Sequence, residues 1–164
     1  MVVTDNLAEG VSPRRQLEFL APPHPFTAAA SGDRMVIAPE SYARFDGFAA
    51  TVATVDAHAL ASAYRALHPV IEAAYRALGY PGASLDRVTA RALRRIAAAP
   101  VADGPVAIVR TAPGGPYLLA DAGLERLPAV EKQLLRMGPR NTRLLQAKAR
   151  ELLRALRLDG ATGR

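Results

Sequence analysis

The chain has 164 residues, no cysteine and a formal net charge of +6, from 21 basic and 15 acidic side chains. This length suits one domain with a sizeable core, and the lack of cysteine excludes disulfides, thiolate zinc sites and cysteine nucleophiles. Residues 131–164 hold nine basic and three acidic side chains and therefore carry the whole positive excess. No apolar run approaches the roughly 18–20 residues of a membrane span, and no signal peptide is predicted. We therefore expect a soluble chain with a basic C-terminal segment.

The first 38 residues predict an extended segment that contains a hairpin. Residues 1–10 form a short stretch of mixed polarity that ends at a glycine, and four prolines between residues 13 and 25 prevent a long helix. Residues 26–29 and 34–37 flank a Ser-Gly-Asp turn, which is typical of a small β-hairpin.

Helices are predicted from Pro39 onward, because proline suits a first helical position. Tyr42, Phe45, Ala49 and Val52 then recur at helical spacing, which indicates one amphipathic helix over this stretch.

The clearest amphipathic pattern follows Asp56, which is a good N-cap. Six apolar side chains fall within an arc of about 80° at 100° per residue: Leu60, Tyr64, Leu67, Ile71, Tyr75 and Leu78. This stripe predicts a buried face. Pro69 projects away from the stripe and is expected to bend the helix, and Gly79 is predicted to end it.

The second half of the chain predicts more helices and a second hairpin. Ser84 is expected to cap a helix that runs to about Ala98. Two short strands are predicted at 105–109 and 117–119, around a Pro-Gly-Gly turn. The remaining helical elements are a short turn capped by Asp121, a helix over 128–138 and a last helix over 139–158.

Together these elements predict a mainly α fold. We expect a single compact helical domain over residues 1–164, with one or two small β-hairpins and an extended proline-rich N-terminal segment. Residues 1–38 are expected to pack as an extended and hairpin segment on a helical body formed by residues 39–164. No internal repeat or low-complexity linker divides the chain.

Several stretches, in this order and spacing, cover nearly the whole chain: VVTDNLAEG, SPRRQL, PPHPF, SYARFDGF, AYRALHPVIEAAYRALGYP, AAAPVADGP, EKQLLRMGPRN and LLQAKARELL. They resemble a bacterial family known as domain of unknown function 3014 (DUF3014). Members typically carry an N-terminal membrane helix and a variable linker before this domain. The resemblance therefore implies the periplasm-facing domain of a membrane-anchored envelope protein, here without its anchor. It implies no activity.

The stretch RMGPRN is the sharpest candidate for a local site. Gly138 is predicted to separate two helices, and the first turn of the second helix presents free N–H groups. The polar residues expected around that end are Lys132, Arg136, Arg140 and Asn141. Such amides and cations can hold a carboxylate or a phosphate. The structural alternative is a tight helix–helix corner, in which Met137 packs and an arginine pairs with a distant acid.

Two helices also have basic faces. On the last helix four arginines lie within about 60° of one another: Arg143, Arg150, Arg154 and Arg157. On the helix after Ser84 the basic residues are Arg87, Arg91, Arg94 and Arg95. Each face can be an ordinary solvated surface, or it can bind anionic lipid headgroups, an acidic partner or nucleic acid. Aromatic residues do not interleave with these arginines, which disfavours single-stranded nucleic acid.

Catalytic and metal-binding motifs are not apparent in the sequence. The three histidines do not have the spacing of a metal site, no serine lies in a nucleophile motif, and the glycine pair at 114–115 fits a turn better than a phosphate loop. We therefore predict no catalytic residue, no metal and no cofactor. Asp46 is expected to pair with an arginine.

These observations predict a non-catalytic envelope domain that binds a protein partner or an anionic envelope component. An enzyme of unknown reaction is the alternative from another class, with a site drawn from Tyr42, Arg44, Asp46, Lys132 and Arg136. Nucleic-acid binding through the C-terminal basic helix is a third possibility. An enzyme should show a pocket in which titratable groups converge, whereas a binding module should show a shallow groove or an apolar patch rimmed by charge.

Overall fold

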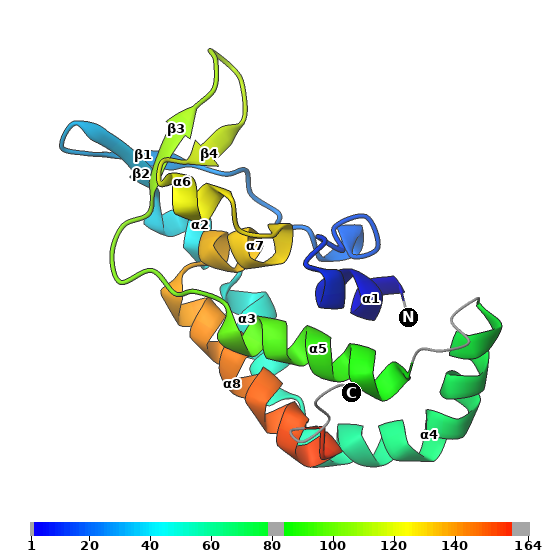
Figure 1. Cartoon of the computed structure of the whole chain (residues 1–164). Helices are drawn as coiled ribbons and strands as arrows, with labels where there is room; N and C mark the ends of the chain where they lie inside the picture. The colour runs from blue at the N-terminus through cyan, green and yellow to red at the C-terminus, as the bar shows by residue number, and fades with distance from the viewer. Residues whose placement is uncertain (1, 79–83, 159–164) are drawn as a thin grey trace.

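Helices make up most of the structure, a computed structural model that describes residues 2–78 and 84–158, and a small sheet lies at one end (Figure 1). The helices are α1 (Val2–Glu9), α2 (Pro39–Ala43), α3 (Asp46–Thr54), α4 (Ala57–Ala77), α5 (Leu85–Ala98), α6 (Ala122–Glu125), α7 (Ala129–Met137) and α8 (Pro139–Leu156), with a 3₁₀ turn at Glu18–Leu20. The strands are β1 (Ala28–Ser31), β2 (Arg34–Ile37), β3 (Ala107–Arg110) and β4 (Tyr117–Leu119). The predicted mainly α fold class is confirmed.

The two predicted hairpins join into one antiparallel sheet with the strand order β1-β2-β3-β4. Met35 pairs with Ile108, and Val36 pairs with Ala107, so β2 and β3 connect the hairpins. An isolated two-stranded hairpin of this size is marginal in water. The union of the hairpins and their packing on α7 through Leu135 therefore stabilise both of them.

The helical core is centred on α5 and α8, which pack against each other, while α1 packs on α5 and α3 packs on α8. Val130, Leu134 and Met137 of α7 form a buried cluster, against which Phe45 and Phe48 pack. This cluster places α7 between the sheet and the helical body.

Two details differ from the prediction in the N-terminal half. Residues 2–9 are helical rather than extended, because Ala8 is fully buried and Gly10 ends the helix with a φ of +76°. The single helix expected after Pro39 is two helices, since the chain turns at Arg44 and Phe45. The proposed division into an N-terminal segment and a helical body stays a prediction.

The helix ends also show which predicted caps are real. Asp56 accepts hydrogen bonds from the N–H groups of His58 and Ala59, and Asp121 accepts one from Leu124, as predicted. Ser84 occupies the N-cap position without a side-chain hydrogen bond. Gly79 lies outside the described residues.

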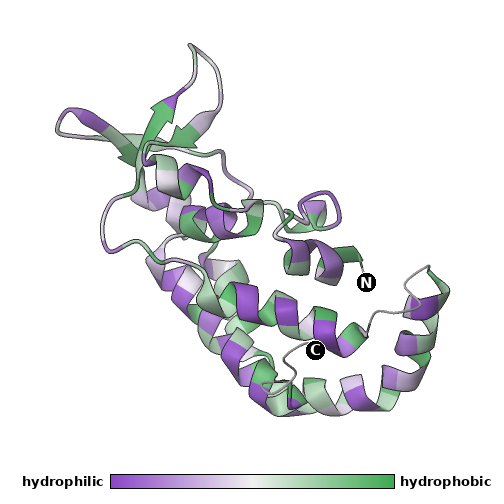
Figure 2. Ribbon diagram, viewed as in Figure 1, coloured by the Kyte–Doolittle hydropathy of each residue, from purple (hydrophilic) through white to green (hydrophobic). Residues whose placement is uncertain are grey.

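Helix α4 buries less of its apolar surface than the sequence predicts. Tyr64, Ile71 and Tyr75 pack with α1 and α5, whereas Leu60 and Leu67 are 45% and 55% exposed. Figure 2 shows hydrophobic residues recurring along α4, which extends along the lower edge of the molecule and then turns upward at the right of this view. The structure therefore buries only part of the predicted apolar stripe, because the body covers only one side of this helix. No helix within 2–78 or 84–158 is long and apolar enough to cross a membrane.

The corner between α7 and α8 requires glycine. Gly138 has φ +83° and ψ 162°, and a Cβ atom there would lie 2.6–2.8 Å from three atoms of Tyr42. We expect Gly138→Ala to lower the free energy of unfolding by at least about 2 kcal/mol, because backbone strain and a steric clash add. Urea denaturation measures this loss.

A matched control is Gly47→Ala, since Gly47 is in α3 and has open space around its Cβ position. That variant should keep or gain stability, by up to about 1 kcal/mol. Equal stability of Gly138→Ala and the unaltered protein would contradict the role given to this corner.

Candidate ligand-binding site

Lys132 and Arg136 lie one turn apart on α7 and approach the same carboxylate. Lys132 Nζ donates to Glu125 Oε1 at 2.6 Å and to the Glu125 carbonyl oxygen at 2.9 Å. The nearest Arg136 nitrogen is 4.0 Å from Glu125 Oε2. Lys132 is therefore tightly held, and Arg136 is only weakly held.

Two opposing effects act on the pKa of Glu125. Burial raises this pKa, but the hydrogen bonds from Lys132 Nζ and from the Leu119 N–H lower it, with help from the charge of Arg136. The donors prevail, so the pKa of Glu125 is lower than usual. Glu125 thereby links α6, α7 and β4.

Arg140 and Asn141 approach a different carboxylate. Arg140 lies 3.4 Å from Asp46, which confirms the arginine partner predicted for this acid. The Asn141 amide nitrogen donates to Asp46 Oδ1 and to the carbonyl oxygens of Tyr42 and Met137, at 2.8–3.0 Å. Asn141 is 1% exposed. Its NH₂ group thus joins α8 to α2, α3 and the end of α7.

The structure therefore divides the four residues predicted around RMGPRN into two pairs, one at Glu125 and one at Asp46. Met137 is buried beside this corner. The anion-binding role of these residues stays a prediction. Arg136 differs from the other three, because it also lines an open groove.

This groove, which we call the arginine groove, has a volume of about 820 Å³ and lies between the proline-rich segment, α3 and α7. Its charged lining residues are Arg14, Arg15, Glu18, Arg44 and Arg136. Its large apolar lining residues are Leu17, Leu20, Phe26, Phe45, Phe48 and Met137. The volume falls in the range of small-molecule sites, about 300–1,000 Å³.

The cations of the arginine groove exceed its acids by four to one. Arg14 and Arg15 are exposed and form no ion pair with any other residue of the described ranges. With the weakly held Arg136, they leave positive charge uncompensated at the rim. An anion there would meet guanidinium groups that are protonated at any ordinary pH.

One wall of the arginine groove is fixed by Ser41 and Arg44. Ser41 Oγ is fully buried; it accepts from the Thr27 N–H at 2.7 Å and lies 2.8 Å from the Thr27 carbonyl oxygen. Arg44 donates to the His24 carbonyl oxygen at 2.9 Å, and its guanidinium lies over the rings of Phe26 and Phe45. These contacts hold the proline-rich segment against α2.

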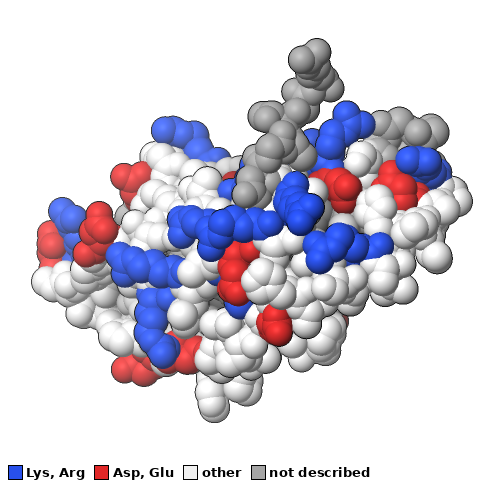
Figure 3. Space-filling view, turned by 90° about the horizontal axis from the view of Figure 1, so that it is seen from below, with Lys and Arg blue, Asp and Glu red and all other residues white. Residues whose placement is uncertain are grey.

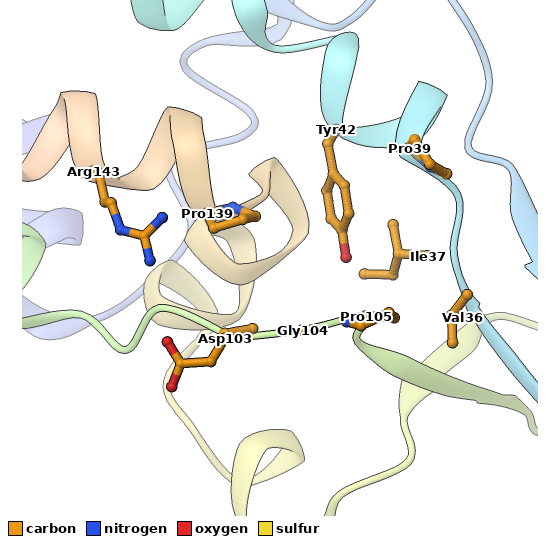
Figure 4. A pocket seen from close by; sticks show the side chains of 10 residues that line it. Val36, Ile37, Pro39, Tyr42, Asp103, Gly104, Pro105, Pro139 and Arg143 are labelled. Carbon is orange, nitrogen blue, oxygen red and sulfur yellow. The ribbon is translucent and has the colours of Figure 1, made fainter. Parts of the chain in front are cut away.

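A smaller cavity of about 350 Å³ lies on another side of α2, between β2, the loop before β3 and the start of α8. Figure 4 shows the Tyr42 ring extending between α2 and this loop, with Asp103 and Arg143 at the other side of the cavity. Burial raises the pKa of the Tyr42 hydroxyl, and the backbone of Val106 partly offsets this rise. Tyr42 lines this cavity and Asp46 does not. These two members of the enzyme hypothesis therefore do not share a pocket.

The basic face of α8 is exposed at Arg143, Arg150 and Arg154. The predicted fourth member, Arg157, is exposed but lies outside the helix, because α8 ends at Leu156 and Arg157 has a left-handed φ of +58°. Arg150 donates to the Ala97 carbonyl oxygen at 2.8 Å, and no described carboxylate lies within ion-pair distance of these four residues. Figure 3 shows basic side chains across the face that is seen from below, with acidic side chains among them.

Three arginines on the basic face of α5 contact acids or a carbonyl oxygen of neighbouring segments. Arg91 pairs with Glu9, Arg95 lies 2.6 Å from Glu131, and Arg94 donates to the Leu158 carbonyl oxygen. These contacts join α5 to α1, α7 and the end of α8. Helix α8 is therefore the better candidate for a free basic surface.

Most of the arginine groove is not apparent in the sequence. The adjacent Arg14 and Arg15 after a proline were the available signal. Their convergence with Phe45, Phe48 and Arg136 depends on long-range packing that no local pattern reveals.

A comparison with protein-family models matches residues 1–153 to a family described as protein of unknown function, DUF3014. The match spans most of the chain, so the chain belongs to this family, and the resemblance seen in the sequence is confirmed. No curated protein and no solved structure matches the chain. Within the described residues, no group of three or more His, Asp or Glu side chains could hold a metal ion.

The lowered pKa of Glu125 predicts a pH-dependent contribution to stability. A carboxylate with a lowered pKa stabilises the fold above its usual pKa of 4.5, and this stabilisation disappears as the pH falls through the lowered value. We expect Glu125→Gln to lower the free energy of unfolding by about 1–2 kcal/mol at pH 7. The difference from the unaltered protein should shrink below about pH 4.

Urea denaturation at a series of pH values tests this expectation. The control is Glu18→Gln, since Glu18 is exposed and pairs with no described cation. A constant deficit of Glu125→Gln down to pH 2 would show that its charge is not the cause.

Proposed function

We propose that this domain binds an anionic amphiphile of the cell envelope, a molecule with a phosphate or carboxylate head and an apolar chain. The observation that carries the proposal is the arginine groove, where Arg14, Arg15 and Arg136 lie beside an aromatic lining. The resemblance to anchored envelope proteins supports a periplasmic location for this binding.

The head of such a ligand matches the rim of the groove. Arg14 and Arg15 have no acidic partner among the described residues, and Arg136 has only one at 4.0 Å. Guanidinium groups bind phosphate and carboxylate through paired hydrogen bonds. An anion would gain these bonds without breaking a strong ion pair of the protein.

The chain of the ligand matches the interior of the groove. Phe26, Phe45 and Phe48 are half-buried and supply three aromatic rings. Burial of apolar surface against them gives about 25 cal/mol per Å². An inorganic ion would leave this surface unused, so an amphiphile fits the groove better than phosphate alone.

The proline-rich wall favours an apolar chain over an extended peptide. Pro13, Pro22 and Pro25 line the groove and have no backbone N–H to donate. Peptides that bind in extended form depend on main-chain hydrogen bonds, and this wall supplies few donors for them. A protein partner is therefore the second class of ligand and an outcome of the test below.

The arginines also favour binding over catalysis. An arginine side chain stays protonated at neutral pH and cannot act as a general base. The groove holds four such groups beside Glu18 and His24. These residues are suited to neutralise and orient an anion.

Isothermal titration with dodecyl phosphate below its micellar concentration tests the proposal. We expect a dissociation constant on the order of 1–100 μM, with much weaker binding of inorganic phosphate and of the neutral dodecyl maltoside. Arg14→Ser/Arg15→Ser should weaken the binding of dodecyl phosphate at least about tenfold, because two cations of the rim are lost.

The matched control is Arg150→Ser/Arg154→Ser, which removes the same charge from α8 and should leave this binding unchanged. Equal binding of dodecyl phosphate and dodecyl maltoside would remove the role of charge. No binding of dodecyl phosphate would overturn the proposal and favour a protein partner.

The exposed basic face of α8 favours a second, separate contact with an anionic membrane surface. Arg143, Arg150 and Arg154 lie along one helix, Arg157 follows its end, and no described carboxylate forms an ion pair with any of the four. Basic residues near an anionic surface each contribute about 1 kcal/mol.

Co-sedimentation with phosphatidylglycerol vesicles and with phosphatidylcholine vesicles tests this contact. We expect preferential pelleting with the anionic vesicles, a loss of pelleting in 0.5 M salt (about 4 Å Debye length), and a severalfold reduction for Arg150→Glu/Arg154→Glu. Equal pelleting of this variant and the unaltered protein would remove the α8 contact. Loss of pelleting in Arg14→Ser/Arg15→Ser alone would assign vesicle binding to the arginine groove instead.

A further inference from the structure

The smaller cavity beside α2, which we call the α2 cavity, has two opposite charges at one side and an apolar wall at the other. Asp103 and Arg143 supply the charges, and Val36, Ile37 and Pro39 belong to the apolar wall. Figure 4 shows the two charged side chains on one side of the Tyr42 ring and the apolar wall on the other side. The charges therefore lie together rather than at opposite ends of the cavity.

Neither of these charges is neutralised within the described part of the protein. Asp103 and Arg143 are exposed, and neither forms an ion pair with the other or with any other side chain of residues 2–78 and 84–158. Burial raises the pKa of the Tyr42 hydroxyl, so this group adds no charge at neutral pH. A ligand with one positive and one negative group would meet both charges without breaking an ion pair of the protein.

The loop that carries Asp103 is held at both of its ends. The side-chain amide of Gln146, a buried residue of α8, donates to the Ala99 carbonyl oxygen at 2.7 Å. The Ile37 N–H donates to the Val106 carbonyl oxygen at 3.0 Å. These bonds tie the loop to α8 and to β2, so the cavity is largely formed before a ligand arrives. A preformed site loses less conformational freedom on binding.

The layout of the α2 cavity matches that of a free α-amino acid. In such a molecule the ammonium and carboxylate groups share one carbon atom, so both charges lie at one end and the side chain lies at the other. The carboxylate can accept paired hydrogen bonds from Arg143, the ammonium group can donate to Asp103, and an apolar side chain can contact Ile37. The volume of about 350 Å³ is at the lower end of the range of small-molecule sites, which suits a single residue rather than a peptide.

We propose that the α2 cavity binds a free α-amino acid with an apolar side chain. This inference is independent of the proposed amphiphile binding, because no residue lines both the α2 cavity and the arginine groove. Arg143 also belongs to the basic face of α8, but the vesicle experiment depends on Arg150 and Arg154. The two proposals can therefore fail separately.

Titration of isotope-labelled protein with L-leucine, followed through amide chemical shifts, tests this site. We expect the amide signals of Gly104 and Ile37 to shift, with a dissociation constant on the order of 0.1–1 mM. Isocaproate lacks the ammonium group of leucine and isoamylamine lacks its carboxylate, so each should bind at least about fivefold more weakly. No shift at Gly104 up to about 10 mM leucine would overturn the proposal. Equal affinity for leucine, isocaproate and isoamylamine would also overturn it.

Two variants and two matched controls test the charged residues. Arg143→Gln and Asp103→Asn should each weaken leucine binding at least about fivefold, because each removes one charged contact. Both variants should stay folded, since both residues are exposed and form no ion pair with a described residue. The controls Arg150→Gln and Asp33→Asn remove the same charges elsewhere and should bind leucine like the unaltered protein. Unchanged binding by Arg143→Gln and Asp103→Asn, or an equal loss in the controls, would contradict the proposed site.

Discussion

The corner at Gly138 and Asn141 is the contact on which the rest of the structure depends. Gly138 allows α7 and α8 to meet directly under the Tyr42 ring. The buried Asn141 amide then donates to acceptors on three segments. A buried amide must find partners, so this residue specifies how α2, α3, α7 and α8 meet. Phe45, on the turn before α3, and Arg136, on α7, reach the arginine groove from elements that this corner holds together.

The arginines of this protein divide into structural and free groups. Arg91, Arg94 and Arg95 connect α5 to neighbouring elements, and Arg44 holds the proline-rich segment. The contacts of Arg94 with the Leu158 carbonyl oxygen and of Arg95 with Glu131 are partly buried, where a charged hydrogen bond is stronger than on the surface. The net charge of +6 therefore overstates the general basicity of the surface. The positive charge that is free to bind a ligand lies at the rim of the arginine groove and along α8.

Local signals predicted most elements of the fold. Proline at the start of α2, aspartate before α4 and the turn between β1 and β2 each act within a few residues, so their effects are visible in the sequence. The helix over Val2–Glu9 was missed because its stability comes from packing: Ala8 lies against α5, and Asp5 accepts from Tyr75 at 2.9 Å. Tertiary contacts override weak local preference in such short helices.

The candidate sites also depend on tertiary contacts that local sequence signals do not reveal. The residues of RMGPRN are adjacent in the sequence, but the acids that hold them, Glu125 and Asp46, come from α6 and the start of α3. The arginine groove likewise brings residues 12–26 to α7, across more than 100 positions of the chain. Spacing along a chain predicts which side chains share a helix face. It does not predict which acid will neutralise a cation, and that partner decides whether the cation is free to bind a ligand.

The apolar surface of α4 is wider than its packing on the body requires. A helix that packs on one neighbour needs an apolar arc of about 100°, and the buried residues of α4 from Ala57 to Tyr75 already supply one. The exposed Leu60, Leu67 and Val70 extend the apolar arc beyond what the body can cover. The low aromatic content and many alanines of the chain leave few large side chains for the core, so three large apolar side chains on one exposed face are lost to that core.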